Sequence, residues 1–301
     1  MANVRGIYVN QQSIHSTNKL NFLIKMAKST MINTFVVDLH RMTETYKKNI
    51  ALLEEANIDM YTRIIVFPGG ASKEQVQSPD YIQKRIELAK QAAELGSKVI
   101  QLDYIRYSTK QRKSPENAKD ILGVIQQFKK ANLNFNLPLH IAVFGESLFS
   151  PSTAIGQNIP LFSPSIDGIA PMLYPSHYKP YKKRTKEAYK TIHDSLSALK
   201  LQFNDNIPFE VIPYFEIFNI RVPMTKEVRL QYIQDQIKAI EDHEVGGWIA
   251  WSATNKYGYL FEVLESISQE EPIEKKIEEG TIKDEAVEKN IEILPSQTET
   301  L

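Results

Sequence analysis

The stretch from Val99 to Tyr107 combines an apolar run with three chemically capable side chains at its end, Asp103, Tyr104 and Arg106. A short apolar run predicts a buried strand. A buried carboxylate destabilises a fold unless its charge is paired or used. In parallel β/α folds, active-site acids lie at the carboxyl ends of strands. Asp103 is therefore the first candidate for a catalytic residue, and an ion pair with Arg106 or Arg63 is the structural alternative.

Other apolar runs end in residues of the same character. Carboxylates follow them at Asp38, Glu146 and Glu216. Rings and hydrogen-bonding side chains follow them at Tyr174, His177, Tyr178, Tyr214, Trp251, Asn255 and Tyr257. Aromatic rings beside carboxylates suit a sugar, because its C–H face packs on a ring while its hydroxyls bond to acids and amides. We predict that Asp38, Arg106 and these seven residues bind substrate.

Cleavage of a glycosidic bond needs two carboxyl groups, one to protonate the leaving oxygen and one to act as nucleophile or base. We predict Asp103 as the nucleophile or transition-state stabiliser. Glu216, ahead of Glu146, is the predicted proton donor, with a pKa raised by aromatic neighbours such as Tyr214.

These side chains need a scaffold that brings strand ends together. Helical stretches such as residues 79–95 and 226–241 alternate with eight runs rich in β-forming residues, at 5–9, 34–38, 63–67, 98–103, 139–144, 167–173, 209–215 and 247–251. Such alternation predicts a (β/α)8 barrel over residues 1–267. A doubly wound sheet would carry a Gly-rich phosphate loop after its first strand, where this chain has Val9-Asn10-Gln11-Gln12.

Residues 268–301 are rich in Glu and Lys and contain no aromatic residue. Their apolar residues are too few to offset the entropy of ordering, so we predict an acidic C-terminal tail that is mostly disordered or loosely helical. A partner-binding tail is the alternative.

Composition excludes several functions. The 36 Lys and Arg balance the 36 Asp and Glu, so neither a nucleic acid nor an anionic membrane is a predicted partner. The absence of cysteine rules out disulfides, Cys-ligated metals and thiol nucleophiles. No apolar span reaches the roughly 18 residues of a transmembrane helix. No signal-peptide core follows Met1, so we expect a cytoplasmic protein, or an exported one if a signal was removed.

Other barrel chemistries lack their signatures. No two histidines form the His-x-His pair of a metal-dependent hydrolase barrel, and Lys98 lies at the wrong end of its run for a Schiff base. We therefore predict no metal and no cofactor. The predicted partner is a polysaccharide or oligosaccharide, and the sequence indicates no particular oligomeric state.

Five segments resemble the bacterial putative glycoside hydrolase domain, a family first catalogued as a domain of unknown function. They are Val4–Val9, Ile100–Tyr107, Val143–Gly145, Pro171–Tyr178 and Gly247–Tyr257. The resemblance runs from about Val4 to Leu264. It implies a TIM-barrel fold and a polysaccharide substrate.

The chain departs from the family pattern at its acids. Ala142 and Ile217 stand where the family has aspartates, and His40-Arg41 replaces an acidic loop after Asp38. One hypothesis is that Glu146 and Glu216 compensate and the barrel is a glycosidase. A second is a noncatalytic carbohydrate-binding barrel, and a third is an interaction scaffold that uses the tail.

Overall fold

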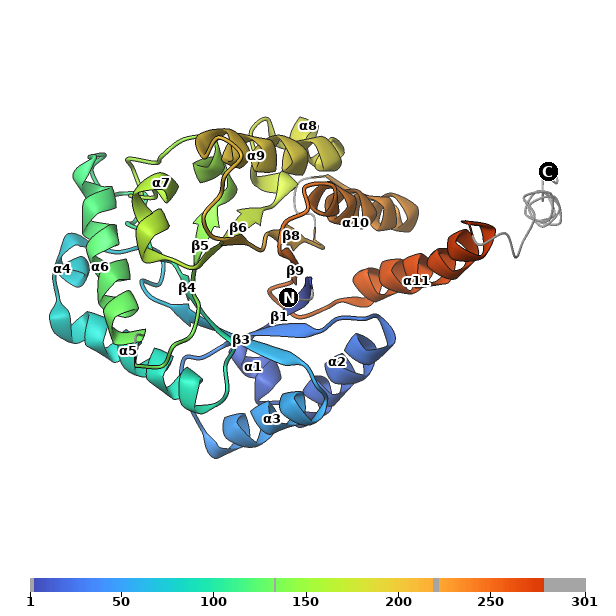
Figure 1. The fold of residues 1–301 in the computed structure, drawn as a ribbon, viewed down its shortest axis with the longest axis horizontal. Helices are drawn as coiled ribbons and strands as arrows, with labels where there is room; N and C mark the ends of the chain where they lie inside the picture. The colour runs from blue at the N-terminus through green and yellow to red at the C-terminus, as the bar shows by residue number, and fades with distance from the viewer. Residues whose placement is uncertain (1–2, 133, 219–221, 279–301) are drawn as a thin grey trace.

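The computed structural model describes residues 3–132, 134–218 and 222–278, and it is a closed parallel barrel (Figure 1). The strands pair in the order β5-β4-β3-β2-β1-β9-β8-β6-β7, and β5 also pairs with β6, which closes the ring. The strands are β1 (Val4–Val9), β2 (Thr34–Asp38), β3 (Asp59–Ile65), β4 (Val99–Asp103), β5 (Leu139–Phe144), β6 (Gly168–Leu173), β7 (Glu210–Val211), β8 (Tyr214–Glu216) and β9 (Gly247–Trp251).

Helices surround the barrel and connect successive strands (Figure 1). The longer ones are α2 (Thr17–Ser29), α3 (Glu44–Glu55), α5 (Pro79–Glu94), α6 (Glu116–Asn132), α9 (Ala188–Gln202), α10 (Lys226–Glu241) and α11 (Gly258–Glu278). Shorter segments are α1 (Gln11–Ile14), α4 (Lys73–Val76), α7 (Ile159–Phe162), α8 (Tyr181–Lys186), and the 3₁₀ turns η1 (Gly145–Leu148), η2 (Ser163–Ser165) and η3 (Pro175–His177). None of the described helices is long and apolar enough to span a bilayer.

The predicted (β/α)8 barrel is confirmed, with three differences in its elements. The third strand begins at Asp59, so Arg63 lies near its carboxyl end rather than at its start. The seventh strand is divided into β7 and β8 around Pro213, because proline donates no hydrogen bond to a ladder. Helix α11 continues to Glu278, so the first part of the predicted tail is helical; residues 279–301 lie outside the described residues.

The side chains that point into the barrel are mostly apolar, but they are charged near the carboxyl ends of β2, β3 and β4. The lower interior is an apolar cluster of Val4, Tyr8, Val36, Tyr61, Val99, Ala170, Tyr174, Ile212, Tyr214 and Ile249. Two residues after Val36 and Tyr61 come Asp38 and Arg63, on the same faces of β2 and β3. The sequence pattern therefore delivers charged side chains to the carboxyl end of the barrel, where β4 adds Asp103.

Hydrogen bonds between the two ends of the chain close the barrel. At the amino end of the strands, Val4 N–H donates to the carbonyl of Gly246 at 2.9 Å. At the carboxyl end, Asn255 Nδ2 donates to the Tyr8 carbonyl at 2.8 Å, and the Tyr257 hydroxyl donates to the same oxygen at 2.5 Å. Asn255 has φ of 52°, in the left-handed region that asparagine tolerates better than most residues.

Candidate active site

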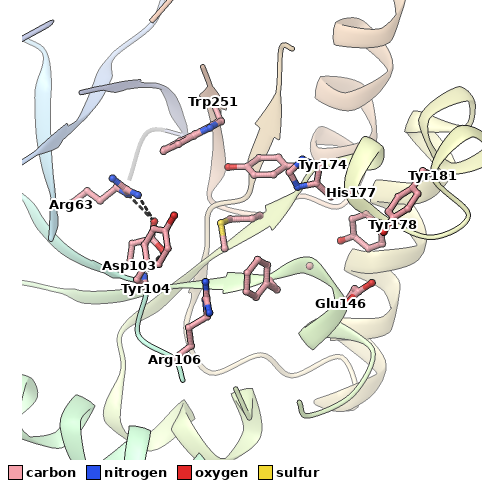
Figure 2. Close-up of a pocket in the computed structure, with 13 residues that line it drawn as sticks. Arg63, Asp103, Tyr104, Arg106, Glu146, Tyr174, His177, Tyr178, Tyr181 and Trp251 are labelled. Atoms are coloured by element: carbon pink, nitrogen blue, oxygen red, sulfur yellow. Dashed lines mark hydrogen bonds and ion pairs between the residues drawn. The ribbon is translucent and has the colours of Figure 1, made fainter. Parts of the chain in front are cut away.

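A pocket of about 460 Å³ lies at the carboxyl ends of the strands (Figure 2). Seven of the side chains around it are aromatic or imidazole groups, and four are charged. The lining residues are Arg63, Asp103, Tyr104, Arg106, Phe144, Gly145, Glu146, Met172, Tyr174, His177, Tyr178, Tyr181 and Trp251. The size and the mixture of rings and ionisable groups are those of a small-molecule site.

Arg63 binds two carboxylates at one wall of the pocket. Its Nη1 lies 2.5 Å from Asp38 Oδ1, and its Nη2 and Nε lie 2.6 and 2.8 Å from Asp103 Oδ2. Burial alone would lower the pKa of Arg63, but Asp103 and Asp38 outweigh it and raise this pKa well above its usual value. Tyr8 donates its hydroxyl to Asp38 Oδ2 at 2.5 Å. The network keeps Arg63 charged beside both acids.

The backbone after Asp103 adopts a special conformation. Tyr104 has φ of 53°, which is unfavourable for a residue with a β-carbon, by about 1–2 kcal/mol. This conformation directs the Tyr104 N–H to Asp103 Oδ1 at 2.5 Å. Local strain of this kind gathers at functional sites. Asp103 is therefore oriented from both sides while it is 6% exposed to the pocket.

Aromatic rings form the wall beside this ion-pair network. Trp251 stacks on Tyr8 with ring centroids 3.9 Å apart and an interplanar angle of 21°. The Arg63 guanidinium lies 5.1 Å from the Trp251 ring centroid. Tyr174 is buried, and burial raises its pKa well above 10, so its hydroxyl remains a proton-bearing donor at neutral pH. Trp251 thus offers the pocket a flat apolar ring held rigidly from behind.

The opposite wall comes from the segments after β5 and β6 (Figure 2). Glu146 is exposed there, next to Gly145 at the start of η1. A β-carbon on Gly145 would lie 1.6 Å from the Tyr178 hydroxyl, so only glycine admits that ring. His177 packs edge-on against Tyr174, with centroids 5.5 Å apart. The pocket thus sets Glu146 and His177 on the wall across from Asp103.

Glu216 does not reach this pocket, contrary to its predicted pairing with Asp103. It is 0% exposed and absent from the lining. Its carboxylate accepts from Ser176 N–H at 2.7 Å, the Ser176 hydroxyl at 2.8 Å and the Tyr232 hydroxyl at 2.6 Å. A carboxylate bound in this way to η3 and α10 holds secondary-structure elements together. Glu146 is the glutamate that shares the pocket with Asp103.

Four predicted substrate-binding residues also lie outside the lining. Asp38 is buried behind it, paired with Arg63. Tyr214 lies inside the barrel, where its hydroxyl donates to Gln101 Oε1. Asn255 and Tyr257 are occupied by the closure bonds to Tyr8. The other predicted binding residues line the pocket: Arg106, Tyr174, His177, Tyr178 and Trp251.

The structure adds residues that the sequence analysis did not place in the site. They are Arg63, Tyr104, Phe144, Gly145, Met172 and Tyr181. The sequence predicts Arg63 only as an ion-pair partner of Asp103. The sequence does contain a pattern that could have placed Arg63 in the site. Tyr61 and Arg63 are two residues apart and so share one face of a strand that ends two residues later. Within the described part of the chain, no three His, Cys, Asp or Glu side chains gather as a metal site would require.

Comparisons with solved structures support the fold. Similar structures include the C-terminal domain of a putative chitinase from Desulfitobacterium hafniense, with a TM-score of 0.60, 11% identity, and coverage of 88% of this chain and 99% of that one. The spore cortex-lytic enzyme SleL of Bacillus megaterium is similar with a TM-score of 0.61 and 10% identity, and the match covers 88% of this chain and 73% of that one. The endo-β-1,4-mannanase of Thermotoga petrophila is similar with a TM-score of 0.62 and 9% identity, and the match covers 89% of this chain and 76% of that one. At these identities the likeness shows the fold alone.

Sequence comparison is more specific. No curated protein matches the chain. A family model described as a putative glycosyl hydrolase domain matches residues 73–257, a span that includes Asp103, Arg106, Glu146 and Trp251. Because that match covers more than half of the 301 residues, the chain belongs to the putative glycosyl hydrolase domain family.

Proposed function

We propose that this barrel hydrolyses glycosidic bonds of a polysaccharide or oligosaccharide in the pocket at its carboxyl end. One observation carries the proposal: two carboxylates on successive strand ends, Asp103 and Glu146, line one pocket whose other walls are largely aromatic. Membership of the family supports it. Sugar rings pack on flat side chains such as Trp251, and two acids are what glycosidic hydrolysis requires.

The environments of the two acids suit different roles. Asp103 lies against the Arg63 guanidinium and accepts the Tyr104 N–H, so its carboxylate is held in a fixed orientation where it lines the pocket. We assign Asp103 to stabilise positive charge at the anomeric carbon or to attack it. Glu146, on the opposite wall, would deliver a proton to the leaving oxygen. A separation of about 5–5.5 Å in the substrate complex would give retention, and about 6.5–9.5 Å inversion.

A noncatalytic carbohydrate-binding barrel is the second candidate, and the bonding of Asp103 favours it. Both Asp103 oxygens already accept hydrogen bonds, from Arg63 and from the Tyr104 N–H. Ala142, where the family resemblance implies an aspartate, is buried on β5 and provides no additional acid. In this case the rings and Arg106 hold the sugar and no bond is cleaved.

The test is a turnover screen on bacterial exopolysaccharides, peptidoglycan, chitin and mannan. Wild type is compared with Asp103→Asn and Glu146→Gln, and the exposed Glu116→Gln serves as the matched control. Release of reducing ends by wild type and the control, with a fall of about 10²–10⁴-fold in Glu146→Gln and a larger one in Asp103→Asn, supports hydrolysis. Binding of a glycan by all four proteins without any release supports the binding candidate. Equal turnover by all four proteins rules out both proposed residue roles.

A further inference from the structure

Arg106 is a buried cation that faces the pocket without an ionic partner among the described residues. It is 9% exposed, and no described carboxylate lies within ion-pair distance of it. Its Nη1 donates to the Tyr107 carbonyl at 2.9 Å. Nε and Nη2 have no hydrogen-bond partner in the described structure, and neither is sealed from the pocket that Arg106 lines. These two donors are therefore open to the pocket and available to a ligand.

The guanidinium of Arg106 is held in place. It lies 5.2 Å from the Tyr104 ring centroid and 5.1 Å from that of Phe144, so two aromatic rings flank it. Its backbone carbonyl accepts the Ala71 N–H at 2.8 Å. A β-carbon on Gly70, whose φ is 100°, would lie 2.7 Å from Arg106 Nη1. Glycine at position 70 therefore makes room for the guanidinium, and little entropy is lost when a ligand binds it.

The contrast with Arg63 indicates what Arg106 is for. Arg63 is fully engaged by Asp38 and Asp103, so its charge is neutralised within the protein. Burial lowers the pKa of Arg106, and Tyr104 and Asp103 oppose this only in part. An arginine nevertheless stays charged at neutral pH. Figure 2 shows its nitrogen atoms directed toward the middle of the pocket, between the walls that carry Asp103 and Glu146.

We propose that the pocket selects a glycan bearing a carboxylate, such as a hexuronic acid, and that Arg106 is the residue that determines this specificity. The inference rests on the proposed function in so far as it assigns the ligand of the same pocket. A carboxylate fits best, because the free Nε and Nη2 donors form the planar edge that binds two carboxylate oxygens side by side. A multiply charged phosphate is disfavoured, because Asp103 and Glu146 line the same cavity.

The experiment measures binding rather than turnover. Hexasaccharides of galacturonate, mannuronate and hyaluronan are each compared with their carboxyl-reduced forms by titration calorimetry. The proteins are wild type, Arg106→Gln, Arg106→Lys and the control Arg112→Gln, whose side chain is exposed and outside the pocket. We expect wild type and the control to bind at least one acidic member about 10- to 100-fold more tightly than its reduced form.

Arg106→Gln should lose that preference, because its affinity for the acidic ligand should fall much more than its affinity for the reduced ligand. Arg106→Lys, which keeps the charge but not the planar edge, should retain an intermediate preference. Near-ultraviolet circular dichroism checks the fold, and Arg106→Lys decides the matter if Arg106→Gln does not fold. No preference in wild type for any pair, or an unchanged preference in the Arg106 variants, overturns the proposal.

The two proposals fail separately. Turnover of a neutral glycan with no preference for acidic ones overturns the assignment of Arg106 and leaves hydrolysis standing. A preference that depends on Arg106 in a protein that cleaves nothing supports the assignment and counts against hydrolysis.

Discussion

Asp103 and Glu216 are both buried carboxylates at the carboxyl ends of barrel strands, yet their surroundings differ in kind. Asp103 lies against the Arg63 cation and faces a cavity. Glu216 is 0% exposed, accepts hydrogen bonds from Ser176 and Tyr232, and faces packed protein. The difference teaches that what lies in front of a buried carboxylate, a cavity or packed protein, separates an acid available for chemistry from one that ties elements together.

The largest expected effect is on turnover in Asp103→Asn. Removing the charge should lower kcat by about 10³-fold or more, because the stabilisation it gives belongs to the transition state. The fold should persist, since Arg63 keeps Asp38 as its partner. Reducing-end assays and urea unfolding measure the two quantities, with the exposed Asp80→Asn as control. Comparable activity of the two variants would remove Asp103 from the mechanism.

Arg63→Met should have the next largest effect, on stability. It leaves Asp38 and Asp103 buried without their cation, and removal of one partner of a buried pair costs about 3–5 kcal/mol. Urea unfolding near neutral pH measures the loss, and Arg41→Met, an exposed position, is the matched control. An unchanged free energy of unfolding would show that the network is not a net contributor.

Glu216→Gln tests the other side of the comparison. The amide NH2 group of glutamine cannot accept the hydrogen bonds that a carboxylate oxygen accepts at this position. We therefore expect a loss of about 1–3 kcal/mol in the free energy of unfolding. Tyr232→Phe, which removes one of the donors, should cost about 1 kcal/mol. Turnover per folded molecule should stay within a few-fold of wild type in both. A collapse of kcat at full stability would return Glu216 to the mechanism.

The smallest expected effect concerns a buried group kept neutral at the other end of the barrel. Burial lowers the pKa of His140 to about 4, although its Nε2 lies 3.3 Å from Glu210 Oε2. The unfolded chain, with an ordinary histidine pKa, takes up a proton first as the pH falls below about 6.5. Stability from His140 is therefore present above that pH and is lost as the pH falls toward about 4.

The measurable loss from His140 should be about 1–2 kcal/mol between about pH 7 and about pH 5. Glu210, whose pKa burial raises, opposes it, and His243, lowered to about 4 by burial, adds to it. His140→Phe keeps a ring of similar size that never titrates, so its unfolding free energy should fall less over the same interval. Identical pH dependence in both proteins would show that His140 is not the titrating group.

Much of the architecture could be predicted from the sequence, because alternation of strand and helix is a local signal. Strands at 34–38, 139–144 and 247–251 have the predicted bounds. Arg63 was misplaced because Met60, Tyr61 and Thr62 were not recognised as strand residues. Asp103 could be predicted to face the barrel mouth because it ends an apolar run.

The role of Glu216 could not be predicted, because its partners come from separate elements. Ser176 lies 40 residues earlier in the chain and Tyr232 lies 16 residues later. Nothing in the sequence around Ser176 or Tyr232 indicates that these residues contact Glu216. Asn255 and Tyr257 illustrate the same limit, since their bonds to Tyr8 span 247 and 249 residues.

Those closure bonds also determine when the pocket can exist during synthesis. β1 emerges first from the ribosome, but one of its two neighbours is β9, with Val4 opposite Gly247. Until β9 is made, β1 and β8 each present an open edge of unpaired backbone groups, which invites pairing with other chains. Trp251, Asn255 and Tyr257 arrive together in one short segment. The last part of the barrel to be translated therefore completes both the sheet and the Trp251 wall of the pocket, so an incomplete chain is an aggregation hazard.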